Sequence, residues 1–493
     1  MVDKGASRMD RSIAENPSKD VVAGGAAQRS ALPQPVSDAL SALLGARFSV
    51  GLAEREQHGR GESYHAVQPP DAVCYAETTD EVARIVQICA ADDIAIVPFG
   101  AGTSLEGHVG AVRGGVCIDL SRMTRIVAVR PDDLDVTVEA GVTRHQLNDH
   151  LRDTGLFFPV DPGGESTLGG MAATRASGTN AVRYGTMREN VVSLTAVLAD
   201  GSVVVTGSRA RKSSAGYDLT RLLVGSEGTL GIITEVTVRL YGIPETMSAA
   251  ICPFGTVDEA IATVVAIIQC GIPIARVELL DVRTIQATNR YSSLANREAP
   301  TLFMEFHGSP ASVAEQMSLV QDLAEQNGAL AFESAADAET RNRLWRARHN
   351  VHYAIQAMRP NARVWSTDVC VPISQLGRCI AETQADIEGA SFFISTVGHV
   401  GDGNFHLGLV IDPGSAAELA EAEAINDRLV RRAIALDGTC TGEHGVGSGK
   451  IKFMTLEHGR GVEMMRAIKM ALDPAGILNP GKIIPAQPFP ANA

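Results

Sequence analysis

The sequence lacks the features of disulfide-rich, membrane-spanning and nucleic-acid-binding proteins. Its eight cysteines contain no Cys-x-x-Cys pair, a usage typical of a reduced compartment. It has no run of about 18 or more uncharged apolar residues, because the nearest, Ile261–Val277, is interrupted by polar and helix-breaking residues. The formal net charge of −14 argues against nucleic acid or an anionic membrane surface as the main partner. A small anionic substrate would therefore need local basic residues.

The first residues also lack the apolar segment of a signal peptide. Residues 1–38 are rich in Ala, Gly, Ser and charge, so we expect a disordered tail. Its acidic residues argue against a transit peptide. We expect a cytoplasmic protein with no transmembrane span, and peripheral contact with the inner membrane is left open. The 493 residues are too many for one core and predict two or three domains.

A glycine-rich loop follows a predicted strand at Ile94–Val97. It reads Pro98-Phe-Gly100-Ala101-Gly102-Thr103-Ser104-Leu-Glu-Gly107-His108. Without a Cβ, glycine lets backbone N–H groups approach a pyrophosphate. The spacing is not Gly-x-Gly-x-x-Gly at the start of a helix, so a nicotinamide-binding Rossmann unit is not indicated. A tight turn at the strand end explains this loop equally well.

Two further segments are crowded with small residues. The first runs from Asp161 to Gly178, and glycines gather again between Gly225 and Ile233. So many small residues are costly in chain entropy unless the backbone must pass something flat or phosphorylated. These segments therefore indicate a large cofactor.

Strands and helices alternate after Tyr241. A strand at Met247–Pro253 precedes a helix at Val257–Gln269, and this pattern favours an α+β domain with helices over an antiparallel sheet. A predicted helix at 338–358 contains Arg346 and Arg348, which lie about 200° apart around it. One of them suits a carboxylate clamp, and a surface salt bridge is expected for the other.

Two histidines flank a strong turn signal. Asp402-Gly403 lies between the apolar runs 392–397 and 407–411 and is typical of a two-residue hairpin turn. That turn would pair His399 directly with His406, with Cβ atoms about 4.5–5.5 Å apart. Glu443, in a glycine-bracketed segment with His444, would complete a His₂Glu metal site with open positions. Ordinary strand histidines and a solvated loop are the alternative, and the pattern does not choose between zinc, manganese and iron.

A set of segments between residues 40 and 485 carries a family resemblance. They are Pro98 to Gly107, Asp161-Pro-Gly, Gly169-Gly-Met-Ala-Ala, Ala176 to Arg188, Arg211 to Thr220, Val224 to Gly231, Asp368-Val-Cys-Val-Pro372, Gly398 to His406, Thr441 to Gly445 and Leu478-Asn-Pro-Gly-Lys482. Together they resemble FAD-linked oxidases of the vanillyl-alcohol oxidase type, and within that group the cytochrome- or quinone-linked D-lactate dehydrogenases.

The resemblance implies an α+β fold. It predicts a two-subdomain FAD-binding domain of PCMH type at 39–244, a substrate domain with an antiparallel sheet at 245–450, and C-terminal helices at 451–493 that return to the FAD domain. The loop 98–107 would hold the pyrophosphate, and 161–178 and 225–233 the rest of FAD. The implied FAD-binding residues are Pro98, Gly100, Ala101, Gly102, Thr103, Ser104, Gly107, Pro162, Gly163, Ser166, Thr167, Gly169, Gly170, Ala173, Ser177, Gly178, Gly185, Glu227, Gly228, Ile232, Ile233 and Asn479.

The resemblance also implies a reaction, the oxidation of D-lactate or another D-2-hydroxy acid to the 2-keto acid. Its implied residues are Arg348 as carboxylate clamp, His444 as the base that removes the hydroxyl proton, Asn404 as a third catalytic residue, and His399, His406 and Glu443 as ligands of zinc or manganese. Electrons would pass to cytochrome c, a quinone or an electron-transfer flavoprotein. A glycolate or D-2-hydroxyglutarate dehydrogenase and a non-catalytic flavin-binding subunit are the alternatives, and a homodimer is left open.

Two positions depart from the resemblance. Relatives that act on 2-hydroxyglutarate carry a lysine just before the Asp-x-x-x-Pro element, where this chain has Val364-Trp-Ser-Thr367. The missing cation favours a substrate with one carboxylate. Arg175 stands where glycine is usual beside the flavin loop, and the sequence offers no account of it. A covalent flavin link through His108 is not expected.

Overall fold

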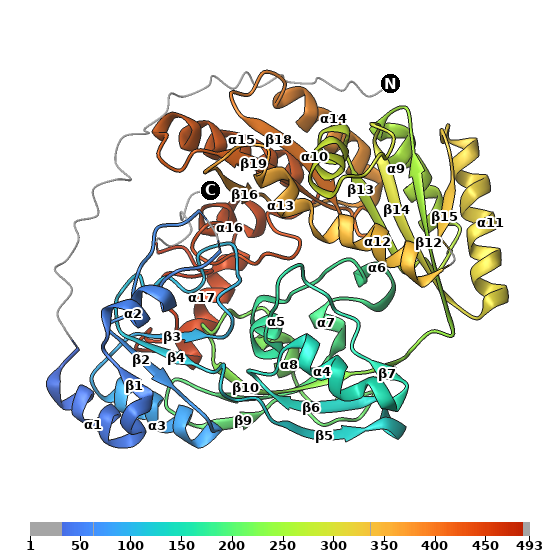
Figure 1. The fold of residues 1–493 in the computed structure, drawn as a ribbon. Coiled ribbons are helices and arrows are strands. Elements are labelled where there is room, and N and C mark those ends of the chain that lie inside the picture. Colours follow the sequence, from blue (N-terminus) through green and yellow to red (C-terminus); the bar gives the residue numbers. More distant parts are fainter. Residues whose placement is uncertain (1–31, 63, 336, 487–493) are drawn as a thin grey trace, which may run out of the picture.

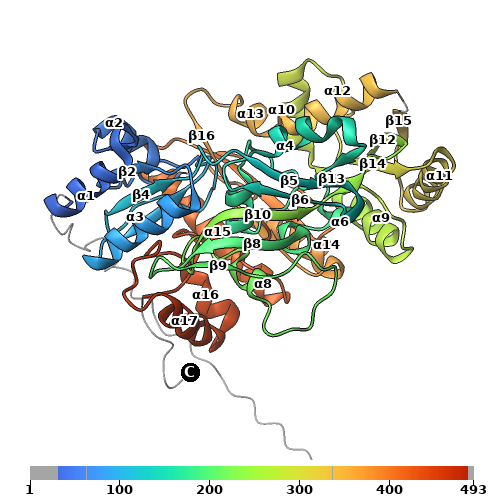
Figure 2. The same ribbon diagram turned by 90° about the horizontal axis from the view of Figure 1, so that it is seen from below.

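The chain folds into two lobes with the C-terminal helices between them (Figure 1). The computed structural model describes residues 32–62, 64–335 and 337–486, so most of the predicted tail 1–38 lies outside the described residues. The N-terminal half forms the lower lobe in Figure 1, and the strands after Thr246 form the upper lobe. Figure 2 shows the two sheets of the lower lobe side by side.

The first sheet of the lower lobe has the order β1-β2-β4-β3, with β2, β4 and β3 parallel. Its helix α3 begins where the side chain of Thr78 accepts the backbone N–H of Glu81, and it buries Val82, Ile85 and Val86 in the core. The elements are α1 (Gln34–Leu44), β1 (Phe48–Ser49), α2 (Leu52–His58), β2 (Ala72–Tyr75), α3 (Thr79–Ala91), β3 (Ile96–Phe99) and β4 (Val116–Asp119).

The second sheet is antiparallel, with the order β5-β6-β10-β8-β9. Its β8–β9 hairpin turns at Asp200-Gly201, and Gly201 takes the positive φ of 79° that such turns require. The elements are β5 (Ile126–Arg130), β6 (Asp135–Glu139), α4 (Arg144–Leu151), β7 (Leu156–Phe157), α5 (Leu168–Thr174), α6 (Ala181–Tyr184), α7 (Met187–Asn190), β8 (Val191–Val197), β9 (Val203–Val205), α8 (Leu219–Leu223), β10 (Ile232–Arg239) and β11 (Tyr241–Gly242).

The upper lobe is an antiparallel sheet in the order β15-β12-β14-β13-β18-β19-β16, with β17 also paired to β19. Its helices cover the sheet, as the alternation of elements predicts. The elements are β12 (Thr246–Pro253), α9 (Val257–Gln269), β13 (Arg276–Leu280), α10 (Val282–Ser292), β14 (Thr301–Gly308), α11 (Pro310–Gln326), β15 (Glu333–Ala335), α12 (Ala338–His349), α13 (Val351–Gln356), β16 (Arg363–Ser366), β17 (Val369–Cys370), α14 (Leu376–Asp386), β18 (Phe393–Gly398), β19 (Asn404–Ile411) and α15 (Ala416–Ala435).

The last two helices, α16 (Ile451–His458) and α17 (Gly461–Leu472), connect the lobes. Phe453 packs in the core of the upper lobe, whereas Leu478 forms a bridge with Ile96 in the lower lobe. The limits 39–244, 245–450 and 451–493 remain predictions. Among the described residues, no helix combines the length and apolar character needed to cross a bilayer.

The predicted helix 338–358 is wrong in one respect. It breaks at Asn350 into α12 and α13. Asn350 has φ −80° and ψ 3° and ends α12, while α13 buries Val351, Ala354 and Ile355 against the sheet. The periodicity spans both helices, but packing of each on the upper lobe sets the break.

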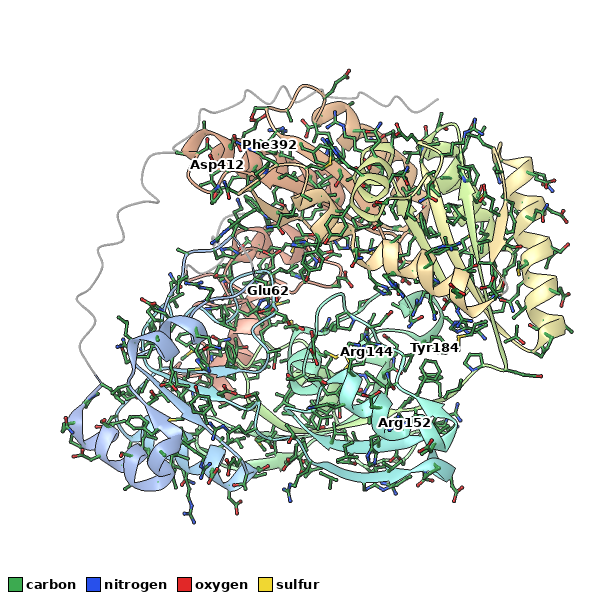
Figure 3. All side chains as sticks on the ribbon, in the orientation of Figure 1. Glu62, Arg144, Arg152, Tyr184, Phe392 and Asp412 are labelled. Atoms are coloured by element: carbon green, nitrogen blue, oxygen red, sulfur yellow. The ribbon has the colours of Figure 1, made fainter. Side chains whose placement is uncertain are left out.

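The lobes also touch directly at Tyr184, labelled in Figure 3 where they meet. Its hydroxyl lies 2.8 Å from Nδ1 of His307 on β14. Arg276 of β13 reaches the same region, donating to Asn180 at 2.7 Å and lying 3.3 Å from Asp161. The upper lobe is therefore anchored to the small-residue segment that the sequence associates with a cofactor.

Candidate active site

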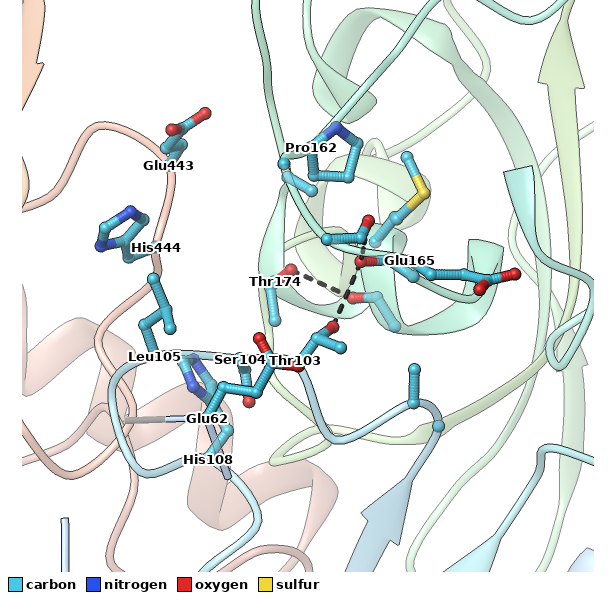
Figure 4. A pocket seen from close by; sticks show the side chains of 18 of the residues that line it. Glu62, Thr103, Ser104, Leu105, His108, Pro162, Glu165, Thr174, Glu443 and His444 are labelled. Atoms are coloured by element: carbon cyan, nitrogen blue, oxygen red, sulfur yellow. Dashed lines mark hydrogen bonds between the residues drawn. The ribbon is translucent and has the colours of Figure 1, made fainter. Parts of the chain in front are cut away.

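A cavity of about 650 Å³ lies between the lobes. Figure 4 shows Glu443 and His444 on one side of it, facing Pro162 and Glu165 across the space, with Thr103 and Ser104 below them. Both lobes contribute to its wall, which brings together the glycine-rich segments and the predicted metal site. Cavities of this size with a few convergent polar groups are typical of cofactor and substrate sites.

The predicted cofactor-binding residues line this cavity, except Gly107 and Gly185. Gly107 instead faces the 443–450 loop, since a Cβ there would lie 2.5 Å from the Ser448 hydroxyl. Gly185 ends α6 and would place a Cβ 2.9 Å from Glu189. Both glycines shape the backbone behind the wall.

Several buried polar atoms on the wall have no hydrogen-bond partner in the part of the chain that the structure describes. They include Nδ1 of His108, Nδ1 of His444 and Oδ1 of Asn479. Buried polar groups in folded proteins are nearly always paired, so unpaired ones on a cavity wall indicate that a bound molecule completes them. These unpaired polar groups, the glycine-rich loops and the volume of the cavity fit a dinucleotide such as FAD.

The structure shows what the side chain of Arg175 contacts. It ends α5 with φ 57°, a conformation that favours glycine. Its guanidinium donates to the carbonyl of Val224 at 3.1 Å and covers Gly225, where a Cβ would lie 2.7 Å from Nε. Arg175 therefore stabilises the loop 224–231 from outside the cavity.

The predicted register of the histidine hairpin is wrong. His406 pairs with Val397, and His399 lies in a wider turn that ends where the N–H of Asn404 donates to the carbonyl of His399 at 3.3 Å. The reason is the turn itself: Asp402 and Gly403 donate to the carbonyls of His399 and Val400, and of these two only Gly403 has the positive φ that a type I′ turn needs at both positions.

The two imidazoles nevertheless converge. Nε2 of His399 and Nε2 of His406 lie 3.1 Å and 3.3 Å from the same oxygen, Oε1 of Glu443. The ring centroids are 5.4 Å apart. Burial alone would raise the pKa of Glu443, but the adjacent His399 and His406 hold it well below its ordinary value, so the carboxylate is charged. Two nitrogens and a carboxylate oxygen thus face one point.

The other ring nitrogens are already engaged. Nδ1 of His399 lies 2.7 Å from the carboxylate of Glu278, and Nδ1 of His406 lies 2.8 Å from the carbonyl of Thr367. Each Nδ1 therefore carries a proton, and a neutral ring keeps its Nε2 lone pair for a ligand on the side of Glu443. A divalent cation between the two Nε2 atoms and the carboxylate would bind all three, so the donor set fits such a metal.

A second group, Asp368, His406 and His444, also has ligand atoms close enough for a cation. It fits less well, because Nδ1 of His406 is a donor to Thr367 and because Asp368 accepts several hydrogen bonds. The first group is the better metal site.

His444 stacks on His406 with ring centroids 5.0 Å apart and lines the cavity. Burial lowers the pKa of His444 to about 4, below the ordinary value of about 6.5 expected from sequence. The ring is therefore neutral at neutral pH and has a free lone pair to accept a proton.

Glycines and a buried carboxylate position the loop that carries Glu443 and His444. Asp368 accepts the backbone N–H of both residues at 2.9 Å, and the carboxylate of Glu227 accepts those of Val446 and Gly447. Gly445 has φ 82°, and a Cβ there would lie 2.7 Å from Glu227.

Asn404, predicted as catalytic, does not line the cavity. Its amide donates to Asp368 and to the carbonyl of Val369, both at 2.7 Å. A Cβ on Gly442 would lie 2.3 Å from this amide, so Asn404 packs directly behind the loop. Its place fits a positioning role, because its donors are used within the protein.

Arg348 lines the cavity, whereas Arg346 on the same helix is exposed. Arg348 donates to Glu278 through Nε at 3.0 Å and Nη2 at 2.5 Å. Sequence reasoning missed Glu278 and Asp368 as site residues. For Glu278 a signal existed, since charged residues at 276 and 278 alternate with Val277 and Leu279 in a strand whose apolar face is core.

Comparison with known proteins decides the family. Residues 70–207 match the family described as FAD binding domain, and residues 243–483 match that described as FAD linked oxidases, C-terminal domain. The chain belongs to the FAD-linked oxidases. FAD is accordingly its cofactor, and the fold is the two-subdomain FAD-binding domain followed by an α+β domain that the sequence predicts.

This FAD-linked oxidase is similar to several curated proteins. It is 52% identical to the Probable D-lactate dehydrogenase, mitochondrial, of Danio rerio, over 93% of each chain. It is 44% identical to the D-lactate dehydrogenase (cytochrome), mitochondrial, of Arabidopsis thaliana, over 95% of this chain and 84% of the relative. The Bacillus subtilis Glycolate oxidase subunit GlcD is 34% identical over 84% of this chain and 89% of the relative.

Solved structures support the fold alone. p-Cresol methylhydroxylase superposes with a TM-score of 0.75 at 18% identity, covering 92% of this chain and 96% of that one. The 4-ethylphenol oxidase of Gulosibacter chungangensis gives 0.74 at 18% identity, covering 92% and 97%.

Proposed function

We propose that the protein is an FAD- and divalent-metal-dependent dehydrogenase that oxidises D-lactate to pyruvate. The convergence of His399, His406 and Glu443 beside His444 and Arg348, on one cavity wall, carries the proposal. Relatives named D-lactate dehydrogenase, at 41–52% identity over most of the chain, support the substrate.

Each residue has a task in this proposal. Arg348 binds the substrate carboxylate through guanidinium hydrogens that Glu278 leaves free. His444 accepts the proton of the 2-hydroxyl, since its ring is neutral and faces the cavity. A bound FAD would supply the acceptor for the hydride of C2, and His399, His406 and Glu443 would hold a cation that supplies Lewis-acid polarisation of the hydroxyl.

Other residues of the chain would hold the cofactor and the loop that carries His444 in place. The predicted FAD-binding residues that line the cavity, from the loop after β3 and the segments 162–178 and 227–233, would bind the cofactor. Upper-lobe residues close the other side and limit access of water. Asp368 and Asn404 fix the loop so that His444 stays within reach of the substrate.

A substrate with one carboxylate suits this cavity. Arg348 is the one Arg or Lys side chain among the described residues that line it. Val351, Ile355, Val364 and Val397 line it and pack together as an apolar cluster. A second carboxylate would lose its water there without gaining a second Arg or Lys partner among the described lining residues.

The proposal also covers the identity of the metal and the electron acceptor. Zinc or manganese fits two imidazoles and a carboxylate. The names of three relatives include cytochrome, which supports cytochrome c as acceptor over a quinone or an electron-transfer flavoprotein. The cytoplasmic location, with or without peripheral membrane contact, remains a prediction, and two relatives are named mitochondrial. The homodimer also remains a prediction.

Anaerobic flavin reduction tests the proposal directly. The purified flavoprotein is mixed with D-lactate, L-lactate, glycolate and D-2-hydroxyglutarate, and bleaching of the flavin absorbance is followed. We expect the largest kcat/KM for D-lactate. Preferential bleaching by glycolate would favour the alternative that the Bacillus relative suggests, and no bleaching by any acid would favour a non-catalytic subunit.

A further inference from the structure

Glu278 is a fully buried carboxylate on β13 of the upper lobe, behind Arg348 and His399, which line the cavity. Val277 and Leu279 point into the hydrophobic core. Arg276 and Glu278 therefore share the opposite face, since successive side chains of a strand point to opposite sides. Arg276 reaches the cofactor segment at Asp161 and Asn180. Glu278 contacts Arg348 and His399, which belong to the proposed substrate and metal sites.

The two oxygens of Glu278 have different partners. Oε1 lies 2.7 Å from Nδ1 of His399, a ligand in the proposed metal site. Oε2 accepts from both Nε and Nη2 of Arg348, at 3.0 Å and 2.5 Å. One carboxylate thus joins the metal ligand to the carboxylate clamp, although the three residues are far apart in sequence.

Each contact has a geometric consequence. Because Nδ1 of His399 donates to Oε1, the lone pair of His399 is fixed on Nε2 and directed at Glu443. Because Oε2 takes the Nε and Nη2 edge of Arg348, the hydrogens left for a substrate are those of Nη1 and the second one of Nη2. A planar guanidinium then offers a defined edge to a second carboxylate.

The environment explains why the carboxylate must be charged. A buried carboxylate is costly unless it is paired, and Glu278 has two cationic or donor partners with no water exposure. The side chain of Arg348 is 12% exposed, so most of this contact is shielded from solvent and its geometry is well defined. A surface ion pair would not orient its partners in this way.

We propose that Glu278 is a positioning residue that sets the metal-facing nitrogen of His399 and the substrate-facing edge of Arg348 together. This inference rests on the proposed function, because it assigns Glu278 to the metal and substrate sites of that reaction. Glu278 does not contact the reacting atoms; it acts through the two side chains that do.

The Glu278→Gln variant tests this role, because a glutamine is nearly the same size but has a single acceptor oxygen and no charge. Mn²⁺ alone is titrated into metal-stripped flavoprotein, and free Mn²⁺ is followed by electron paramagnetic resonance. Outer partners of metal-bound histidines typically contribute about 10–100-fold in affinity, so we expect a Kd for Mn²⁺ weakened by that factor.

The effect of Glu278 on Arg348 is tested with propionate, a monocarboxylate without the 2-hydroxyl that the metal site would bind. Its binding is followed by the change in flavin absorbance at saturating Mn²⁺. In Glu278→Gln we expect weakened propionate binding and a KM for D-lactate raised by about tenfold, with kcat at saturating metal and substrate reduced less.

Asp281→Asn is the matched control. Asp281 is a buried acid that follows β13 directly and accepts the backbone N–H groups of Thr284 and Thr396, away from the cavity. We expect it to lower the unfolding temperature without changing either affinity. Glu278→Asp, which keeps the charge but is too short to reach both partners, is measured alongside in case the glutamine variant does not fold.

The outcomes separate the inference from the function on which it rests. Unchanged Mn²⁺ and propionate affinities in the Glu278 variants would overturn it, as would a change in only one of the two. A wild-type protein that binds no Mn²⁺, or whose Mn²⁺ binding survives His406→Ala, would overturn the proposed metal site and this inference with it.

Discussion

Asp368 accepts the backbone N–H of His444 at 2.9 Å through the same oxygen, Oδ2, that accepts the N–H of Glu443. Lys450 lies 3.7 Å from this oxygen, and both side chains are buried. One carboxylate therefore positions the proposed base and a proposed metal ligand together, from 76 residues away in the chain.

Asp368→Asn should destabilise the protein by about 3–5 kcal/mol, the usual result of breaking a buried charge pair. The amide would also present N–H hydrogens to the backbone N–H groups that the carboxylate accepts. The free energy of unfolding in urea measures this. The partly exposed pair of Asp427 with Arg431 serves as control, since Asp427→Asn should cost about 0.5 kcal/mol or less. Equal losses in both variants would contradict the assigned role.

His444→Gln should leave the flavin bound and reduce the rate of flavin reduction by D-lactate by about 10²–10⁴-fold, the usual contribution of a general base. Stopped-flow absorbance measures the rate. The exposed His145, changed to Gln, should react like the wild type. A His444→Gln rate within tenfold of the wild type would remove His444 from the base role.

Removing the metal should stop turnover without releasing flavin. Dialysis against a chelator followed by elemental analysis gives the metal-free flavoprotein, and Mn²⁺ or Zn²⁺ should restore D-lactate oxidation. His406→Ala should lower the metal content, since it removes one of three protein ligands. Full activity in protein shown to be metal-free would refute the metal assignment.

Gly228→Ala should weaken flavin binding. Gly228 has φ 72° and a Cβ there would lie 2.3 Å from Cγ of Pro98, so the cavity wall would have to move. Gly216→Ala is the control, because Gly216 has φ 82° but nothing within 4 Å of its Cβ position. Both variants carry the backbone strain of about 1 kcal/mol, and Gly228→Ala alone should lose flavin absorbance relative to protein absorbance.

His58 should make stability depend on pH. Its ring nitrogens lie 2.7 Å from the carbonyl of Glu54 and 2.8 Å from Asp119, so both can donate. Burial alone would lower the pKa of His58, but the hydrogen bonds to Asp119 and to the Glu54 carbonyl, together with the charges of Asp119 and Glu54, outweigh it and the pKa is raised. A raised folded-state pKa adds stability that is complete below the unfolded value of about 6.5 and is lost as pH rises through the folded value.

The His58→Gln variant isolates this effect. Its stability deficit relative to the wild type, measured by urea unfolding, should be largest near pH 6 and should shrink toward pH 9. We expect about 2 kcal/mol at the lower pH, as for charge-assisted buried hydrogen bonds. A deficit that does not change with pH would show that His58 is neutral in the folded protein.

Much of the fold was predictable because its signals are local. The helix Val257–Gln269 has the bounds expected from sequence, and its Thr256 cap and apolar spacing lie within the segment itself. The Asp200-Gly201 hairpin is equally local. α2, in contrast, depends on a distant contact, since its one buried residue is His58, whose partner Asp119 lies 61 residues away in sequence.

The candidate site was likewise predictable from the sequence only where its signals are local. The residue types at 399, 406, 443 and 444 pointed to a metal and a base, and the glycine-rich segments pointed to a large cofactor. The hairpin register was wrong, because the turn spans residues 400–403 and Asp402 does not take the positive φ of a type I′ turn. The sequence alone could not show that Asn404 lies behind the loop.

The sequence by itself determined which side chains are available for this chemistry and which backbone turns can bring them close, because turn preference, capping and periodicity act within a few residues. Only the tertiary structure decided which nitrogen of each histidine faces Glu443, since the choice is made by acceptors such as Glu278, 121 residues from His399. Such orientation depends on hydrogen bonds between strands and loops that are distant in sequence and meet only in the folded upper lobe.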